Sequence, residues 1–163
     1  MLNKEEINLP ELENISDEDI VAMADGQIID ITSVPDPVFA EQMMGKSVAF
    51  KYTQDKVVLC SPANGLLKVL FPTGHAFGVE LNNGIELLVH CGIDTVNTKG
   101  DGFRIIAKQG DEVKAGDPIV EVDIEKLSKD YDMSTILIVT DPKDREFEFI
   151  DSQAVKRGQK LTK

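Results

Sequence analysis

The chain has 163 residues, which suits one domain with its own hydrophobic core. Its 29 acidic and 17 basic residues give a formal net charge of -12. This charge disfavours nucleic acid or an anionic membrane as the main partner, because both reward clustered Lys and Arg. A basic protein partner fits better.

The location of the protein is also constrained by its sequence. No apolar run approaches the length of a membrane span, and Met1 begins no signal-peptide pattern. Cys60 and Cys91 form no CxxC pair and are too few for a disulfide framework. We therefore expect a cytoplasmic protein with free, buried thiols.

The first 22 residues form a weakly patterned acidic segment. Ser16, with Asp19 three residues later, could cap a short helix that runs to Met23. The segment lacks the Lys/Arg face that membrane-surface helices need, so we expect no direct membrane insertion. Residues 1–22 are thus predicted to be a flexible arm, and residues 23–163 the folded domain.

Short β-type runs follow, separated by turn residues. The expected strands are Gln27–Ile31, Ser47–Lys51, Val57–Cys60, Leu66–Phe71, Ala76–Leu81, Ile85–Val89, Arg104–Ala107, Ile119–Val122, Ile136–Thr140 and Glu146–Ile150. Only Pro37–Met44 and Ile124–Asp130 look helical, and both are short. This spacing predicts an all-β fold, an antiparallel sandwich or barrel.

Two segments of the sequence recur in altered form. Ala24-Asp-Gly-Gln-Ile-Ile-Asp-Ile returns as Ala63-Asn-Gly-Leu-Leu-Lys-Val-Leu, and Val113-Lys-Ala-Gly-Asp-Pro-Ile returns as Val155-Lys-Arg-Gly-Gln-Lys-Leu. In each pair the glycine keeps its place within the apolar frame. These echoes favour an internally duplicated architecture.

The only two histidines of the chain, His75 and His90, flank a predicted hairpin. Its turn lies in Asn82-Asn83-Gly84, a typical hairpin signal. A two-residue loop at Asn82-Asn83 or at Asn83-Gly84 would put both imidazoles on one face, within side-chain reach. A three-residue loop would put them on opposite faces, because side chains alternate along a strand.

Two neighbouring imidazoles allow three interpretations. They could be metal ligands, although two nitrogens usually need a third protein ligand. They could be a nucleophile and its helper, or two ordinary surface histidines. Flanking glycines, the Thr73 hydroxyl and a surround of apolar side chains favour a functional pair.

Three segments carry a resemblance to a known family. Gly84-Ile-Glu-Leu-Leu-Val-His90-Cys-Gly92-Ile-Asp94-Thr-Val96, Thr73-Gly-His75-Ala-Phe-Gly78 and Val34-Pro-Asp36-Pro-Val-Phe-Ala-Glu-Gln-Met-Met-Gly45 are the matching stretches. Together they resemble the glucose-type enzyme IIA family of the bacterial sugar phosphotransferase system. The resemblance covers roughly residues 22 to 162 and implies a pseudo-duplicated β-sandwich.

The resemblance implies roles for individual residues. His90 would accept a phosphoryl group on Nε2, with its Nδ1–H held by the carbonyl of Gly92. His75 would donate a hydrogen bond to the phosphoryl oxygens, and Thr73 would fix its tautomer. Because the transition state is loose, the site needs positioning and donors; neither a metal nor a cofactor is expected.

The partners implied are the phosphocarrier HPr as donor and the IIB domain of a sugar permease as acceptor. Asp36 and Asp94 would pair with an arginine of the incoming donor. The apolar docking surface that the resemblance implies comprises Val38, Phe39, Met43, Met44, Phe71, Gly78 and Leu88. Docking on two partners in turn favours a monomer.

The sequence departs from the family pattern at two places, and other functions are considered as alternatives. The stretch Leu59–Gly65 is longer than the usual turn, and Met23-Ala-Asp-Gly26 lacks the usual proline. A IIA-like regulator that binds target proteins is the main alternative. A zinc peptidase of related architecture needs more histidines than this chain has, and a purely structural module leaves the paired histidines unexplained.

Overall fold

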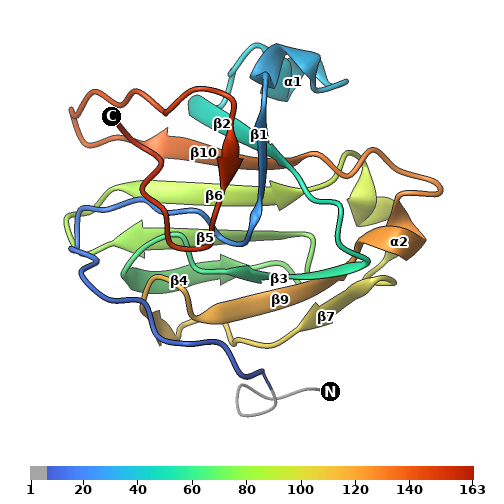
Figure 1. Cartoon of the computed structure of the whole chain (residues 1–163), viewed down its shortest axis with the longest axis horizontal. Helices are drawn as coiled ribbons and strands as arrows, with labels where there is room; N and C mark the ends of the chain where they lie inside the picture. The colour runs from blue at the N-terminus through green and yellow to red at the C-terminus, as the bar shows by residue number, and fades with distance from the viewer. Residues whose placement is uncertain (1–6) are drawn as a thin grey trace.

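The computed structural model describes residues 7–163 as two antiparallel β-sheets (Figure 1). The larger sheet has eight strands in the order β11-β1-β2-β10-β6-β5-β4-β8, and the smaller has three in the order β3-β9-β7. The strands are β1 (Gly26–Ile29), β2 (Lys46–Lys51), β3 (Lys56–Cys60), β4 (Gly65–Leu70), β5 (Ala76–Leu81), β6 (Glu86–Cys91), β7 (Phe103–Ile105), β8 (Glu112–Val113), β9 (Pro118–Asp123), β10 (Thr135–Asp141) and β11 (Ala154–Val155). The predicted antiparallel β-sandwich is confirmed.

Between the sheets lies the main hydrophobic core. Strand β6 shows the alternation that builds it, since Leu87, Val89 and Cys91 are buried while Leu88 and His90 are half-buried on the other face. Cys60 is fully buried as well, and both thiols are free. The expectation that both cysteines belong to the core is therefore confirmed, and His90 faces outward because its neighbours face inward.

A short segment covers part of the outer face of the large sheet. It contains a 3-10 helix, η2 (Ile31–Ser33), and a one-turn helix, α1 (Pro37–Ala40), which lies at the top of Figure 1. Phe39 is 7% exposed and packs with Ala49 of β2 and Ile136 of β10 in a second, smaller core. Because Phe39 of α1 also contacts the ring of His90, this segment forms one side of the surroundings of His90.

The internal duplication is visible in the hydrogen bonds. The carboxylate of Asp25 accepts from the backbone N–H of Arg157 at 2.8 Å, and the side-chain amide oxygen of Asn64 accepts from the backbone N–H of Ala115 at 2.8 Å. The register repeats too, with Gly26 opposite Val155 and Gly65 opposite Val113. The sequence echoes therefore mark two copies of one structural motif.

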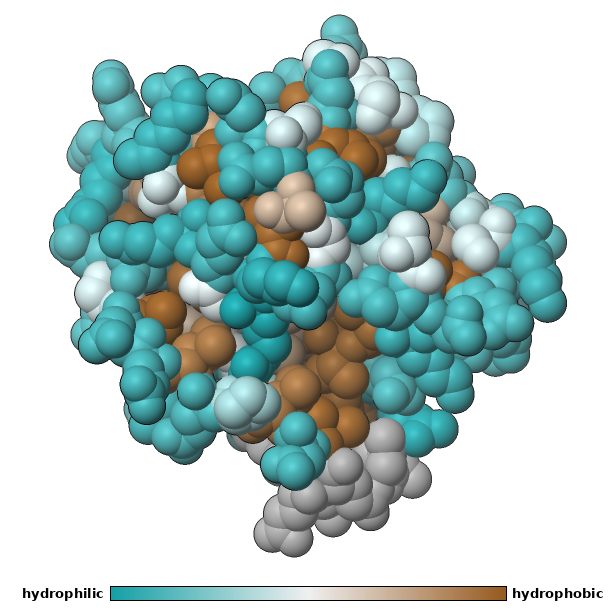
Figure 2. All heavy atoms as spheres, viewed as in Figure 1, coloured by the Kyte–Doolittle hydropathy of each residue, from teal (hydrophilic) through white to brown (hydrophobic). Residues whose placement is uncertain are grey.

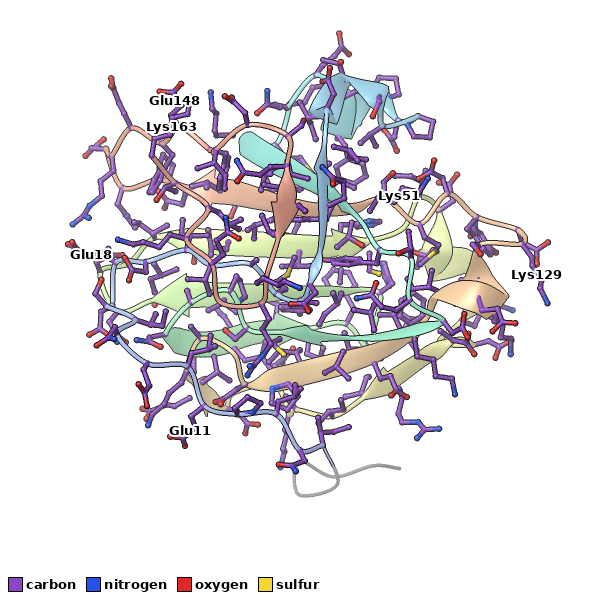
Figure 3. The ribbon with its side chains drawn as sticks, in the orientation of Figure 1. Glu11, Glu18, Lys51, Lys129, Glu148 and Lys163 are labelled. Carbon is purple, nitrogen blue, oxygen red and sulfur yellow. The ribbon has the colours of Figure 1, made fainter. Side chains whose placement is uncertain are left out.

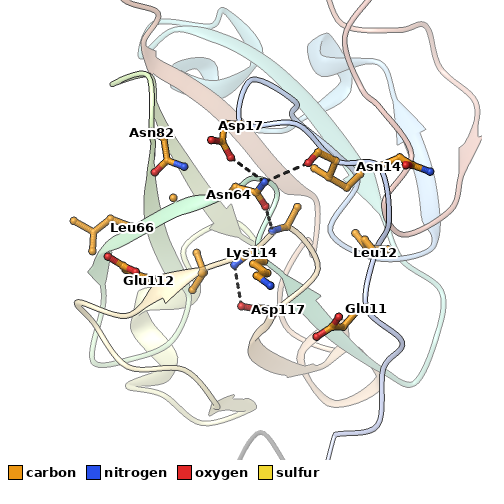
Figure 4. Close-up of a pocket in the computed structure, with 14 residues that line it drawn as sticks. Glu11, Leu12, Asn14, Asp17, Asn64, Leu66, Asn82, Glu112, Lys114 and Asp117 are labelled. Atoms are coloured by element: carbon orange, nitrogen blue, oxygen red, sulfur yellow. Dashed lines mark hydrogen bonds between the residues drawn. The ribbon is translucent and has the colours of Figure 1, made fainter.

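The described part of the N-terminal segment lies against the turns that precede β4 and follow β8 and β11 (Figure 4). Asn64 lies at the centre of that view and donates to Asp17, and Arg157 donates to the carbonyl of Pro10 at 2.9 Å. Leu12 lies over Gly116 and Gly158, the repeated glycines of the two motif copies, where an added Cβ would meet it at 2.8 and 2.7 Å. An open cavity of about 890 Å³ separates this segment from β4 and β8.

Several predicted elements differ from the structure. Ser16 and Asp19 form a turn, in which the N–H of Ser16 donates to the Asp19 carboxylate, so the helix predicted to run to Met23 is wrong. Ile20 and Ala22 belong to the main core, and Val21 between them is fully buried as well. The folded body thus takes in residues that the sequence assigned to the arm; residues 1–6 lie outside the described range.

Other boundaries shift at the ends of elements. Glu146–Ile150 is no strand, since within it only Phe149 makes an isolated bridge, to Thr162. The two predicted helices shorten to α1 and to α2 (Ile124–Leu127), and a further 3-10 helix, η3 (Thr95–Thr98), follows β6. Strands β8 and β11 have only two residues each, too few to show a period in the sequence.

Charged side chains cover the periphery. In Figure 3, Glu148 and Lys163 lie close together at the C-terminal end, where their side chains form an ion pair of 3.2 Å. On the face shown in Figure 2, polar side chains cover most of the surface and apolar ones form small patches between them. Among residues 7–163, no helix is long and apolar enough to cross a membrane.

Candidate active site

The register of the β5–β6 hairpin places His90 directly opposite Ala76. The N–H of Leu81 bonds to the carbonyl of Ile85, so the loop has three residues, Asn82-Asn83-Gly84. Gly84 adopts φ +92°, which glycine allows without strain. Neither predicted two-residue loop is therefore present.

The two histidines nevertheless meet. Their ring centroids lie 5.2 Å apart with the planes at 82°, an edge-to-face contact. His75 lies in the turn before β5, after Gly74 at φ +78°, so strand alternation does not fix the direction of its side chain. The expectation that a three-residue loop would separate the imidazoles was wrong for this reason.

His75 is held on several sides. It is 4% exposed, and its Nδ1 lies 2.5 Å from Oγ1 of Thr73. The ring of Phe71 packs against it edge to face, with centroids 5.2 Å apart. Burial lowers the pKa of His75 and the neighbouring His90 lowers it further, so its imidazole is neutral at pH 7.

His90 lies half-buried at the end of β6 against the ring of Phe39, with centroids 4.9 Å apart. Burial lowers the pKa of His90, while the backbone of Gly92 and the carboxylates of Asp36 and Asp94 act in the opposite direction. Nδ1 of His90 is buried and makes no hydrogen bond of normal geometry within residues 7–163. The pKa shift is downward, so this imidazole is also neutral at pH 7.

The two acidic residues flank His90 from different elements. Asp36 is the N-cap of α1, and its carboxylate accepts from the N–H of Val38 at 2.9 Å. Asp94 begins η3 in the left-handed region, at φ +61°. Both are near enough to raise the pKa of His90, so the structure brings these sequence-predicted residues to the site.

The apolar residues expected around the site divide into two groups. Val38, Met43, Met44 and Phe71 are 40 to 69% exposed, as a docking surface requires. Phe39, in contrast, is 7% exposed and serves mainly as packing. Val96, which follows Asp94 and Thr95 in η3, is an exposed apolar residue too, with 50% of its surface open.

Gly78 and Leu88 lie opposite each other on β5 and β6. With Val69 and Phe71 they line an open groove of about 410 Å³ on the outer face of the sheet. The ammonium group of Lys68, which pairs with the carboxylates of Glu80 and Glu86, lies at the same groove. An apolar surface with charged groups beside it is typical of transient protein–protein contacts.

The chemistry that this arrangement allows is nucleophilic. A neutral imidazole at a partly open surface can attack a phosphoryl group, and a second imidazole beside it can donate a hydrogen bond. Within the described residues, no group of three or more His, Cys, Asp and Glu side chains is arranged to hold a metal ion. The site thus has the features of a histidine that carries a group between docking partners.

Comparisons with known proteins agree with this class. Residues 18–145 match the family model of the phosphoenolpyruvate-dependent sugar phosphotransferase system, EIIA 1. The chain therefore belongs to the EIIA family of the phosphotransferase system, whose members are phosphotransferase components that work with a phosphocarrier and an IIB domain.

Individual relatives resemble the chain in sequence, and one solved structure resembles it in fold. The chain is 39% identical over 142 residues to a PTS system glucose-specific EIIA component of Staphylococcus epidermidis, covering 86% of this chain and 84% of that protein. It is 39% identical over 143 residues to a glucose-specific EIICBA component of Staphylococcus carnosus, of which it spans only 21%. The solved glucose permease IIA from Mycoplasma capricolum superposes with a TM-score of 0.81 at 34% identity, covering 88% of this chain and 93% of that one.

Proposed function

We propose that this chain is a phosphocarrier that takes a phosphoryl group from phospho-HPr onto Nε2 of His90 and passes it to the cysteine of a sugar-specific IIB domain. The observation that carries the proposal is the edge-to-face contact of two neutral imidazoles at 5.2 Å, with one half-buried and the other almost fully buried. The family membership supports the same role.

Each transfer exchanges one bond to phosphorus for another. In the first, the bond from phosphorus to the donor histidine of HPr breaks as the bond to Nε2 of His90 forms. In the second, a cysteine thiolate of the IIB domain attacks and the bond to Nε2 breaks. The transition states are loose, so positioning and electrostatic contacts supply the catalysis.

His75 and Thr73 support the phosphoryl group in this proposal. If the Thr73 hydroxyl accepts a hydrogen bond from Nδ1–H of His75, Nε2 of His75 carries a lone pair. If the Thr73 hydroxyl instead donates to Nδ1, Nε2 carries the hydrogen and can donate it. The 2.5 Å contact between Thr73 and His75 fits either arrangement, and the proposal takes the second because it directs a donor to the phosphoryl oxygens. Charge develops on those oxygens, so a fixed donor there lowers the barrier to transfer.

Docking would use the exposed apolar residues and the two carboxylates. Val38, Met43, Met44 and Phe71 offer flexible and aromatic contact area that can fit two different partners. Asp36 and Asp94 would pair with an arginine of HPr, which also steers the encounter between an acidic and a basic protein. We place this exchange in the cytoplasm and expect a monomer, because each partner needs the same face free.

The test separates uptake from delivery. Wild type, His90→Ala and His75→Gln are incubated with phosphoenolpyruvate, enzyme I and HPr, and then with a glucose-type IIB domain. We expect His90→Ala to take up nothing, and His75→Gln to take up phosphate but to deliver it poorly. Normal delivery by His75→Gln would disprove the helper role, and no uptake by wild type would leave a regulatory domain as the better interpretation.

A further inference from the structure

Thr95 is a fully buried polar residue directly behind the candidate active site. It is 0% exposed, and its hydroxyl donates to the backbone carbonyl of Cys91 at 2.5 Å. Helix capping does not explain this contact, since Asp94 is the N-cap of η3. The bond instead closes the turn that follows His90.

This turn is held on both sides by backbone groups. The N–H of Gly92 donates to the carbonyl of Ser134 at 2.9 Å, and the N–H of Ile93 donates to the carbonyl of Asp132 at 2.9 Å. The peptide unit between Cys91 and Gly92 is therefore bound at its carbonyl by Thr95 and at its N–H by Ser134. Because peptide units are planar, these bonds fix its orientation.

The next peptide unit carries the carbonyl of Gly92. It also carries the N–H of Ile93, which is bound to Asp132. In a trans peptide the C=O and N–H groups point to opposite sides, so the Gly92 carbonyl points away from Asp132. A hydrogen bond to the backbone of Gly92 raises the pKa of His90 and so opposes the effect of burial. We therefore assign the Gly92 carbonyl as the acceptor for Nδ1–H of His90. This nitrogen is buried and has no other partner within residues 7–163.

Packing keeps Gly92 in this conformation. Its φ is +81°, and an added Cβ would lie 2.4 Å from the methyl carbon of Thr95 and 3.0 Å from Sδ of Met133. Thr95 therefore acts on the turn twice, through its hydroxyl on the Cys91 carbonyl and through its methyl group over Gly92. A residue that only filled space would not need the hydroxyl.

We propose that Thr95 is a positioning residue, which orients the Gly92 carbonyl toward Nδ1 of His90 and so keeps Nε2 of His90 unprotonated for attack. This inference rests on the phosphocarrier function proposed above. It assigns Thr95 no contact with the phosphoryl group. Thr95 acts on this carbonyl indirectly, through the neighbouring Cys91–Gly92 peptide unit and through the conformation of Gly92. The hydrogen bond at Nδ1 in turn sets the tautomer of His90.

Two substitutions separate the roles of the Thr95 side chain. Thr95→Val keeps the shape and removes the hydroxyl, whereas Thr95→Ser keeps the hydroxyl and removes the methyl. Nitrogen-15 NMR of the imidazoles reports the tautomer directly, and the spectrum is simple because the chain has only two histidines. His75, bound by Thr73, serves as the internal control in the same spectrum.

We expect wild type and Thr95→Ser to hold His90 with Nδ1 protonated, and Thr95→Val to show a mixture of tautomers with an unchanged His75. Phosphoryl uptake by Thr95→Val should fall by roughly a hundredfold, the loss that a 1 Å misplacement of a reacting group can cause. A Thr95→Val protein with the wild-type tautomer and only a lower melting temperature would overturn the proposal.

The wild-type spectrum is a second test that needs no variant. If Thr95→Val does not fold, a wild-type His90 with Nε2 protonated, or with mixed tautomers, would still overturn the proposal. Failure of the proposed function looks different: wild type would hold the expected tautomer yet take up no phosphoryl group from HPr.

Discussion

Phe39 of α1 packs on the outer face of the large sheet and contacts the ring of His90. Its own ring lies 4.9 Å from the His90 imidazole, and its side chain is buried among residues of β2 and β10. The same side chain therefore packs α1 on the sheet and makes an apolar contact with His90. Fold and site depend on each other at this contact.

Phe39→Ala should change both the stability of the fold and the pKa of His90. We expect the free energy of unfolding to fall by about 3 kcal/mol, as for other buried phenylalanines. Because burial is the main cause of the lowered pKa of His90, that pKa should rise toward its ordinary value in the variant. Urea denaturation and an NMR titration of the imidazole measure the two effects, with Phe39→Leu as the milder control; an unchanged pKa in Phe39→Ala would contradict this assignment.

The pH dependence of stability follows from the two histidines. Both pKa values are lowered in the folded state, so between the folded and the unfolded pKa the unfolded chain binds more protons. The two histidines should therefore leave the free energy of unfolding unchanged above the ordinary histidine pKa of about 6.5, and lower it as the pH falls below that value.

A His75→Gln, His90→Gln double variant should lack this part of the pH dependence. Denaturant unfolding of wild type and double variant, compared between about pH 7.5 and pH 5, measures the difference. Phosphoryl uptake by wild type should likewise persist somewhat below the ordinary histidine pKa, since the nucleophile remains neutral there. Equal pH slopes for the two proteins would argue against lowered pKa values.

Asp36 and Asp94 should affect both the proton affinity of His90 and the docking of HPr. Each carboxylate raises the pKa of His90, so Asp36→Asn and Asp94→Asn should lower it further. Asn keeps the N-cap of α1, whereas Asp36→Ala also loses the bond to Val38, at a cost of about 1 kcal/mol.

In docking, the asparagine variants should accept phosphate more slowly from HPr at low salt, and the difference should shrink as salt screens the charges. Stopped-flow or quench-flow transfer at two ionic strengths tests this. A rate that does not respond to either substitution would place the electrostatic contact with HPr elsewhere on the surface.

Leu12 should stabilise the fold through the N-terminal segment. It lies over the repeated glycines Gly116 and Gly158, so Leu12→Ala should lower the free energy of unfolding by about 1–2 kcal/mol. Leu9, in the same segment but 37% exposed, provides the matched control, and Leu9→Ala should change little. Equal effects of the two substitutions would mean that Leu12 does not anchor the segment.

Much of the fold was predictable from the sequence because strand periodicity and turn residues carry local signals. The strands of the main sheet and the β5–β6 hairpin follow alternation, and the echoes at Gly26 and Gly65 mark the duplication. Strands of two residues have no period, and the run Ile20–Ala22 was assigned to an acidic arm because its burial depends on distant partners.

The site was predictable in part for the same reason. The pairing of His75 with His90 was expected, but the hairpin register behind it was not, because Asn82-Asn83-Gly84 fits loops of two or three residues. The role of Phe39 as packing depends on which face α1 covers, and the bond from Thr95 to Cys91 closes only in the folded turn. Sequence patterns contain neither relationship.

The central claim is that His90 carries the phosphoryl group. The most direct test is intact mass after incubation with phosphoenolpyruvate, enzyme I and HPr, compared for wild type, His90→Ala and His75→Gln. We expect one acid-labile phosphoryl group on wild type and on His75→Gln, and none on His90→Ala. Uptake by His90→Ala, or its loss in His75→Gln alone, would contradict it.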